Sequence, residues 1–460
     1  MVFSSIVFLF YFLPAVLLLY FASPAKYRNF ILFAASLLFY SWGEPVYLSL
    51  MLLSVAMNYA FGRLLARHPR FWLILGCTAN VAFLAFFKYA DFLIENVNQM
   101  TGAALPLPHI PLPLGISFYT FQAMSYVIDV YRHTAQPQKS ILSFGTYIAL
   151  FPQLIAGPIV RYSTIAQQLS CRRSTAEDLS SGAALFCCGL AKKVLLANSA
   201  GALFDQMKGS GTPVSALTAW LGILAFTFQI YFDFSGYSDM AVGLGRILGF
   251  TFPRNFDYPY VSRSITEFWR RWHITLSTWF KEYVYIPLGG NRLGSGRQIC
   301  NLMVVWLLTG IWHGASWNFL VWGLYFGLLL ILEKLVLSRW LSRLPRWFCH
   351  LYTILLVMIS WVVFSMDDLP SAASCLASLT GTHGWWDESG LYLLRNGGAL
   401  FLVLALASTP LPARLWNRLT SGKGSLRRSL LQSAAIFVSL VLVTANLVST
   451  SYNPFLYFRF

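Results

Sequence analysis

One histidine, His313, lies in a long stretch without any charged residue, from Asn301 to Leu332. A titratable imidazole is costly to place in lipid, so such a residue faces a protein interior or a water-filled cavity and marks a functional site. Histidine also offers a neutral base near pH 7, which the deprotonation of a hydroxyl for attack on an acyl group requires. We therefore expect His313 to act as a general base. The alternative is a packing histidine, hydrogen-bonded between helices. Gly310 and Gly314 have the small-residue spacing that lets another helix approach closely.

A second histidine, His273, ends the motif Phe268-Trp-Arg-Arg-Trp-His273, which contains Arg270 and Arg271. Glu267 precedes the two arginines by three and four residues, the spacing of ion pairs on a helix face. One interpretation is an amphipathic helix at the membrane interface with a belt of tryptophans. The other is that the arginines and the imidazole border a site for an anionic donor.

Three further charged residues lie in or beside apolar segments. Asp233 and Asp239 flank Phe-Ser-Gly-Tyr-Ser, where acids can couple ions in a transporter or cap the start of a following helix, with Ser235 near the N-cap. We favour capping and the shaping of the wall of the site. Arg161 follows Ala-Gly-Pro-Ile-Val160 and is expected to meet phosphate or, preferably, anionic lipid.

The motifs of several other enzyme classes are absent from the sequence. It has no G-x-S-x-G elbow, no H-E-x-x-H zinc motif, no Walker loop and no Rossmann glycine pattern. The seven cysteines show no C-x-x-C spacing, so we expect neither a metal site nor a disulfide framework. ATP-driven transport and nicotinamide chemistry are therefore disfavoured.

The composition indicates the elements that must position these residues. Of 460 residues, 57% are hydrophobic and only 11% are charged, and the apolar runs are continuous. This predicts an all-α polytopic membrane protein. The net charge of +16 comes from basic residues that lie mostly between apolar runs, which indicates membrane topology and anionic lipid headgroups, with no nucleic-acid partner.

The apolar runs predict roughly eleven to thirteen spans of about 20 residues within a single membrane domain, residues 1–460. Segment 141–158 is too broken for a plain span and is expected to be re-entrant or kinked inside protein. Spans near 214–232 and 237–250 are expected to flank residues 231–239.

Several motifs together resemble one family, the membrane-bound O-acyltransferases, in the bacterial branch that acetylates alginate or transfers D-alanine to teichoic acid. The motifs, which occur in the order expected for that family, are Gly115-Ile-Ser-Phe-Tyr-Thr-Phe-Gln122, Phe151-Pro-Gln-Leu-Ile-Ala-Gly-Pro158, Tyr231-Phe-Asp-Phe-Ser-Gly-Tyr-Ser-Asp239, Phe268-Trp-Arg-Arg-Trp-His273 and Trp312-His-Gly314. The stretch Tyr285-Ile-Pro-Leu-Gly-Gly-Asn291 resembles the alginate side of this branch.

This resemblance implies tilted helices around a central tunnel, with His313 catalytic, His273 a second site histidine and Trp312 beside the substrates. It also implies acetyl-CoA as the donor and no permanently bound cofactor. The last residues of the 449–460 tail, Phe455-Leu-Tyr-Phe-Arg-Phe460, are similar to an F-x-Y-F-x-F motif whose tyrosine, here Tyr457, is proposed to carry the acyl group. A phenol can do so once a base takes its proton. The alternative is an aromatic belt at the membrane surface.

The resemblance thus predicts an O-acetyltransferase of the bacterial inner membrane that serves an exported or cell-wall polysaccharide. The expected partner is a periplasmic or extracellular acetyltransferase of the SGNH type. One alternative is D-alanyl transfer to teichoic acid. Another is a secondary transporter that uses Asp233 and Asp239. The sequence does not identify the polysaccharide.

Overall fold

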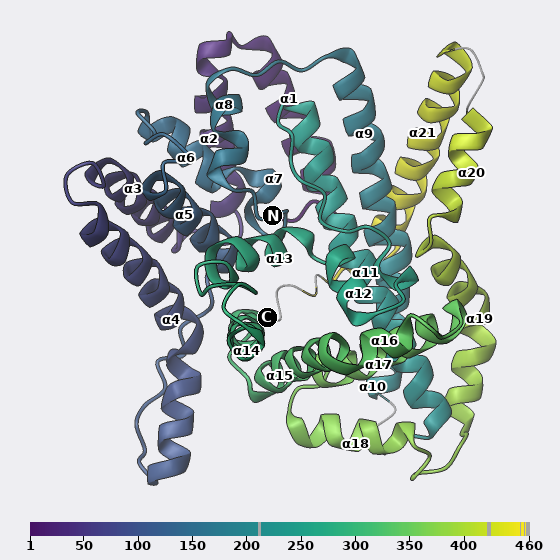
Figure 1. The fold of residues 1–460 in the computed structure, drawn as a ribbon. Coiled ribbons are helices and arrows are strands. Elements are labelled where there is room, and N and C mark those ends of the chain that lie inside the picture. Colours follow the sequence, from purple (N-terminus) through teal and green to yellow (C-terminus); the bar gives the residue numbers. More distant parts are fainter. Residues whose placement is uncertain (210–212, 421–424, 451, 455, 457–460) are drawn as a thin grey trace. The chain divides into compact units, whose positions relative to one another are not determined.

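All regular secondary structure in the computed structural model is helical within the residues it describes, which are 1–209, 213–420, 425–450, 452–454 and 456 (Figure 1). Seven described helical segments are long and apolar enough to cross a membrane: Pro69–Thr101, Ala176–Gly209, Ala216–Ile247, Trp317–Leu341, Arg346–Ser365, Glu388–Ala407 and Arg427–Ser449. Shorter apolar helices are Phe8–Ala22, Leu48–Leu64 and Leu369–Leu379. An all-α polytopic membrane protein is confirmed. The larger expected number of spans included shorter segments such as 29–42, which forms a helix of 14 residues.

The chain divides into two units, residues 1–186 with 237–253 and residues 187–236 with 254–460. The expectations of a single domain and of a central tunnel stay predictions. The helices of the first unit are α1 (Leu13–Ala22), α2 (Arg28–Ser41), α3 (Leu48–Leu64), α4 (Pro69–Thr101), α5 (Ile116–Tyr131), α6 (Ile141–Ala149), α7 (Phe151–Leu154) and α8 (Tyr162–Ser170), with a π-helix, η1 (Phe8–Phe12), before α1. Helix α9 (Ala176–Ala191) begins in this unit.

The first unit confirms the broken helix expected at 141–158. Leu150 has a non-helical backbone and separates α6 from α7, and every residue from 144 to 160 is buried. Phe151 packs in an aromatic core, with its ring centroid 5.8 Å from that of Phe39. The irregular backbone is therefore surrounded by protein, where it is tolerated at membrane depth.

The second unit contains the two candidate site histidines, His273 and His313. Its helices are η3 (Lys192–Ala197, a π-helix), α10 (Asn198–Gly209), most of α11 (Ala216–Ile247), α12 (Ile265–Arg271), α13 (Ile274–Phe280), η5 (Lys281–Tyr285), α14 (Ser295–His313), α15 (Trp317–Leu332), η6 (Glu333–Leu337), α16 (Ser338–Leu341), α17 (Arg346–Ser365), α18 (Leu369–Leu379), α19 (Glu388–Ala407), α20 (Leu411–Thr420) and α21 (Ser425–Ser449). Tryptophans join these helices: the ring of Trp269 lies 4.5 Å from Trp306 and 4.9 Å from Phe326, centroid to centroid.

The prediction of two spans flanking residues 231–239 is wrong, because α11 runs unbroken through them. Gly236 serves packing and does not break the helix: a Cβ there would lie 2.7 Å from the carbonyl oxygen of Gly189. Neither Asp233 nor Asp239 caps a helix, since α11 begins at Ala216. A proline-free segment buried in protein keeps its helical hydrogen bonds despite one glycine.

Helices α14 and α15 form a tightly packed hairpin. A Cβ on Gly323 of α15 would lie 3.1 Å from the Cα of Gly310 and 2.5 Å from the carbonyl oxygen of Trp306. The close approach predicted from Gly310 and Gly314 is confirmed for Gly310, which faces the backbone of α15. The hairpin turns directly after His313, and the hydroxyl of Ser316 starts α15 by accepting the backbone N–H of Asn318 at 3.3 Å.

Candidate active site

His313 is the last residue of α14, and the chain becomes extended at Gly314. A Cβ at Gly314 would overlap the ring of Phe319, so only glycine allows the turn to pack this closely. The turn therefore places the imidazole at the end of a tightly packed hairpin rather than in the middle of a helix.

Aromatic rings surround His313. Its ring centroid lies 4.9 Å from that of Trp322 and 5.3 Å from that of Phe364, both in edge-to-face geometry, and 6.4 Å from that of Phe319. The side chain is only partly buried. Ring packing of this kind fixes the plane of the imidazole while one part of it stays accessible.

His273 lies between α12 and α13 with a left-handed backbone (φ 44°, ψ 53°). Non-glycine residues adopt this conformation at a cost of about 1–3 kcal/mol and mainly where the surroundings impose it. Here the backbone N–H of Asp257 donates to the carbonyl of Arg271, and that of Ile274 donates to the carbonyl of Asn255, each at 2.9 Å. These bonds hold the chain on both sides of His273.

Asn255 determines which nitrogen of His273 carries the proton. Its Oδ1 accepts the backbone N–H of Thr275 at 3.2 Å and the hydroxyl of Thr275 at 2.9 Å, which identifies that atom as the acceptor end of the amide. Nδ1 of His273 lies 3.1 Å from the same oxygen and must therefore donate to it. The lone pair is left on Nε2, which is buried and has no hydrogen-bond partner among the described residues.

Burial lowers the pKa of His273 to about 3, so this imidazole is neutral at physiological pH. Its ring lies 4.7 Å from Phe234 and 6.0 Å from Trp312, centroid to centroid. Trp312 in turn lies 5.0 Å from its neighbour His313. The structure thus brings three predicted site residues together, with the buried indole of Trp312 in ring contact with both histidines.

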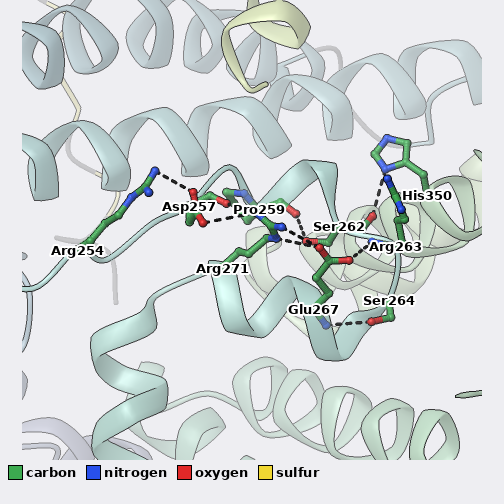
Figure 2. Close-up of polar contacts among 9 residues, drawn as sticks. All are labelled: Arg254, Asp257, Pro259, Ser262, Arg263, Ser264, Glu267, Arg271 and His350. Carbon is green, nitrogen blue, oxygen red and sulfur yellow. Dashed lines mark hydrogen bonds and ion pairs between the residues drawn. The ribbon is translucent and has the colours of Figure 1, made fainter. Parts of the chain in front are cut away.

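The arginines of the same segment lie on its outer side. Arg271 forms ion pairs with Glu267 (2.9 Å) and Asp257 (3.5 Å), and Asp257 also pairs with Arg254 at 2.9 Å (Figure 2). The predicted Glu267–Arg271 spacing is confirmed as a helix-face ion pair. Arg270 is exposed and belongs to none of the ion pairs found among the described residues. Aromatic rings of this segment are buried, whereas Arg270 is exposed and Arg271 partly so. The amphipathic helix and the border of a donor site both stay predictions.

The other predicted site residues are Asp233, Asp239, Arg161 and Tyr457. Asp233 forms a buried ion pair with Lys193, and Phe234, the next residue of α11, contacts His273. Asp239 belongs to the first unit, as does Arg161, which immediately precedes α8. Tyr457 lies outside the described residues. Substrate binding by Asp233, Asp239 and Arg161 and acyl transfer by Tyr457 stay predictions.

Sequence reasoning missed Asn255, which orients His273, and Lys193, the partner of Asp233. Asn255 lies 18 residues before His273, in a segment with no regular helix. A single asparagine among charged residues carries no signal of its own. Lys193 carried a clearer sequence signal than Asn255, because a lysine late in an apolar run requires a partner.

The sequence model of the membrane-bound O-acyltransferase family (MBOAT) matches residues 137–375, which include the helices that carry both histidines. The chain belongs to this family. The chain is 39% identical to a probable alginate O-acetylase AlgI of Pseudomonas putida, over 100% of both sequences. It is 36% identical to a peptidoglycan O-acetyltransferase of Helicobacter pylori, over 84% of the chain and 80% of that protein. It is 28% identical to a teichoic acid D-alanyltransferase of Bacillus subtilis, over 49% of the chain and 61% of that protein.

This MBOAT protein is therefore an O-acyltransferase enzyme with several membrane-spanning helices, and the alginate O-acetylase-like branch expected from the motifs is confirmed. The transporter alternative is set aside because the family's activity is acyl transfer. The full-length likeness to the Pseudomonas putida protein and the partial likeness to the Bacillus subtilis protein give the acetyl alternative more support than the D-alanyl one.

Proposed function

We propose that this enzyme takes acetyl groups from acetyl-CoA and delivers them across the bacterial inner membrane for O-acetylation of an exported or cell-wall polysaccharide. The observation that carries the proposal is the pair of histidines around Trp312, one with a fixed neutral tautomer and one partly accessible. The names of the Pseudomonas and Helicobacter relatives, an alginate O-acetylase and a peptidoglycan O-acetyltransferase, support acetyl as the group.

In this proposal the two histidines divide the work. A general base is most effective when its pKa is near the working pH, so a buried imidazole with a pKa of about 3 is a poor proton acceptor. Nε2 of His273 instead accepts a hydrogen bond and orients the attacking hydroxyl. His313 takes the proton from that hydroxyl as its oxygen attacks the acetyl carbonyl carbon. The carbon–sulfur bond then breaks, and the proton passes to the departing CoA thiolate.

Tyr457 is the proposed first acceptor. Its phenol would gain the acetyl ester and later pass it to a hydroxyl of a periplasmic or extracellular SGNH-type partner, which restores the phenol. Only the acetyl group, and neither CoA nor the polysaccharide, would then cross the membrane. The support is the match of residues 455–460 to the F-x-Y-F-x-F pattern.

Arg270 is the proposed contact for the anionic donor, because it is exposed and unlike Arg271 has no ion pair with Glu267 or Asp257. CoA carries phosphates that an exposed guanidinium can bind. Arg270→Ala should raise the KM for acetyl-CoA, and Arg271→Ala, the matched variant, should chiefly lower the unfolding temperature.

The test is a turnover assay on the purified full-length enzyme in liposomes with radiolabelled acetyl-CoA, followed by mass spectrometry of the quenched protein. His313→Ala should lower CoA release by roughly 10²–10⁴-fold, as expected for loss of a general base. Label should appear on Tyr457 in the wild type and vanish in both His313→Ala and Tyr457→Phe.

The possible results separate the alternatives. Full CoA release by folded His313→Ala would refute the role of His313. CoA release without label on the protein would mean direct transfer to the final acceptor and remove Tyr457 from the mechanism. No reaction with acetyl-CoA, together with turnover of an activated D-alanyl donor, would replace the acetyl proposal with D-alanyl transfer.

A further inference from the structure

A buried ion pair joins η3 to α11 in the second unit. Nζ of Lys193 lies 2.8 Å from Oδ1 of Asp233, and each side chain is 3% exposed. Removing two charges from water is costly unless good geometry and additional hydrogen bonds compensate. The remaining partners of the two side chains therefore indicate what the pair is for.

The C-terminal tail, here the described residues 452–454 and 456, supplies those partners through its backbone. The ammonium of Lys193 donates to the carbonyl of Pro454 and, at 2.9 Å, to Oδ1 of Asn198. The backbone N–H of Leu456 donates to Oδ2 of Asp233 at 2.9 Å. An ammonium has three N–H donors, and Asp233, Asn198 and Pro454 provide three acceptors. The tail thus binds both members of the ion pair.

Side chains around the ion pair set the register of the tail. Nδ2 of Asn198 lies 3.3 Å from the carbonyl oxygen of Tyr452 and 3.3 Å from Oδ1 of Asn453. The hydroxyl of Tyr452 donates to Oδ2 of Asp205 at 2.5 Å. Gly201 leaves room for this contact, because a Cβ there would lie 2.8 Å from that hydroxyl. A shift of the tail by one residue would break several of these bonds at once.

The tail also reaches the core near the candidate active site. Leu456 is 6% exposed and packs in the same hydrophobic cluster as Trp272 and Trp361. Asp233, which binds the Leu456 backbone, immediately precedes Phe234, whose ring lies 4.7 Å from His273. One turn of α11 therefore contacts both the tail and a site histidine.

A contact between the tail and the helices that only stabilised the fold would not need a buried ion pair, since a well-packed apolar pair of similar volume is often at least as stable. We infer that Lys193, Asp233 and Asn198 form a receptor for the enzyme's own C-terminal tail, and that this receptor positions the tail for acyl transfer. The three are positioning residues. The second half of the inference rests on the proposed function, because the residue after Leu456 is Tyr457.

The variant that tests the receptor is Lys193→Met combined with Asp233→Leu, which removes both charges and leaves no unpaired ion. Hydrogen–deuterium exchange of the purified full-length protein would report on the tail. Exchange in the peptide containing Leu456 should be slow in the wild type and at least about tenfold faster in the double variant. Lys192→Met, which removes the neighbouring charge, is the matched control and should leave the tail protected.

Turnover of acetyl-CoA by the same samples would test positioning. A misplaced tail should lower kcat by about tenfold or more and leave the KM for acetyl-CoA within about twofold, because the proposed donor contact, Arg270, does not belong to the tail. Gly201→Ala should act in the same direction, because its Cβ would lie 2.8 Å from the hydroxyl of Tyr452 and would also displace the side-chain amide of Gln229. Since alanine favours helix over glycine, a loss of helix cannot explain such a result.

Equal tail exchange in the wild type and the folded double variant would refute the receptor. Faster tail exchange with wild-type kcat would refute positioning and leave the proposed function intact. Absence of turnover in the wild type itself would refute the proposed function and with it positioning, whereas the exchange data would still decide whether the receptor exists.

Discussion

The two histidines of the site are held in different ways. His273 is fixed by hydrogen bonds: its ring donates to Asn255, and backbone bonds on both sides impose its left-handed conformation. His313 is fixed by packing: it ends a helix, and the rings of Trp322 and Phe364 meet it edge-on. Trp312 contacts both imidazoles.

This difference indicates different tasks. A hydrogen bond to one ring nitrogen selects a tautomer, and burial keeps that tautomer neutral, so His273 suits orientation of a hydroxyl. Ring packing restrains the position of His313, and its imidazole is only partly buried, which suits proton transfer. Disturbing the first arrangement should have an abrupt effect, and disturbing the second a graded one.

Among variants that disturb how the histidines are held, the largest effect is expected from Asn255→Leu. Without the acceptor oxygen, Nδ1 of His273 loses its partner and the preference for a lone pair on Nε2 disappears. We expect kcat to fall by roughly 10–100-fold, by analogy with the loss of a hydrogen-bond partner that orients a metal-binding histidine. The matched control is Thr275→Val, which removes another donor to the same oxygen without changing the acceptor. A kcat reduced equally in both variants would contradict the tautomer argument.

A smaller effect is expected from Phe364→Leu. It removes one ring from the wall around His313 and keeps an apolar side chain of similar size, so the imidazole gains freedom but no hydrogen bond is lost. We expect kcat to fall only about two- to tenfold, in line with an edge-to-face contact worth about 0.5–1.5 kcal/mol. A loss as large as that of Asn255→Leu, measured in the same turnover assay, would mean that His313 is also rigidly oriented.

The contrast between the histidines also explains what the sequence could predict. An uncharged run of 32 residues around His313 is a local pattern, and so are the glycines that bring α14 and α15 together. These features were therefore predictable. Apolar runs likewise predicted the helices, because membrane spans are long and continuous.

The missed features depend on pairings between segments far apart in the chain. Asn255 reaches His273 through a loop, and Lys193 meets Asp233 and the tail across 40 and about 260 residues, separations at which no periodic pattern helps. The predicted helix break at 231–239 was wrong for a related reason. Gly236 is required for close packing against the carbonyl of Gly189, and in the local sequence such a glycine looks like a helix interruption.

The smallest effect we predict is a pH dependence of the unfolding temperature that comes from His273. Burial lowers the pKa of His273 from its ordinary 6.5 to about 3. Between these values the unfolded chain binds a proton at this position and the folded chain does not, so protonation favours unfolding and stability decreases as pH falls below about 6.5. The unfolding temperature of the wild type, followed by tryptophan fluorescence, should therefore drop more between pH 7 and pH 5 than that of His273→Gln. The carboxylates are common to both proteins and cancel in this comparison. Equal drops would mean that His273 is accessible to protons in the folded enzyme, and the division of roles between the two histidines would lose its basis.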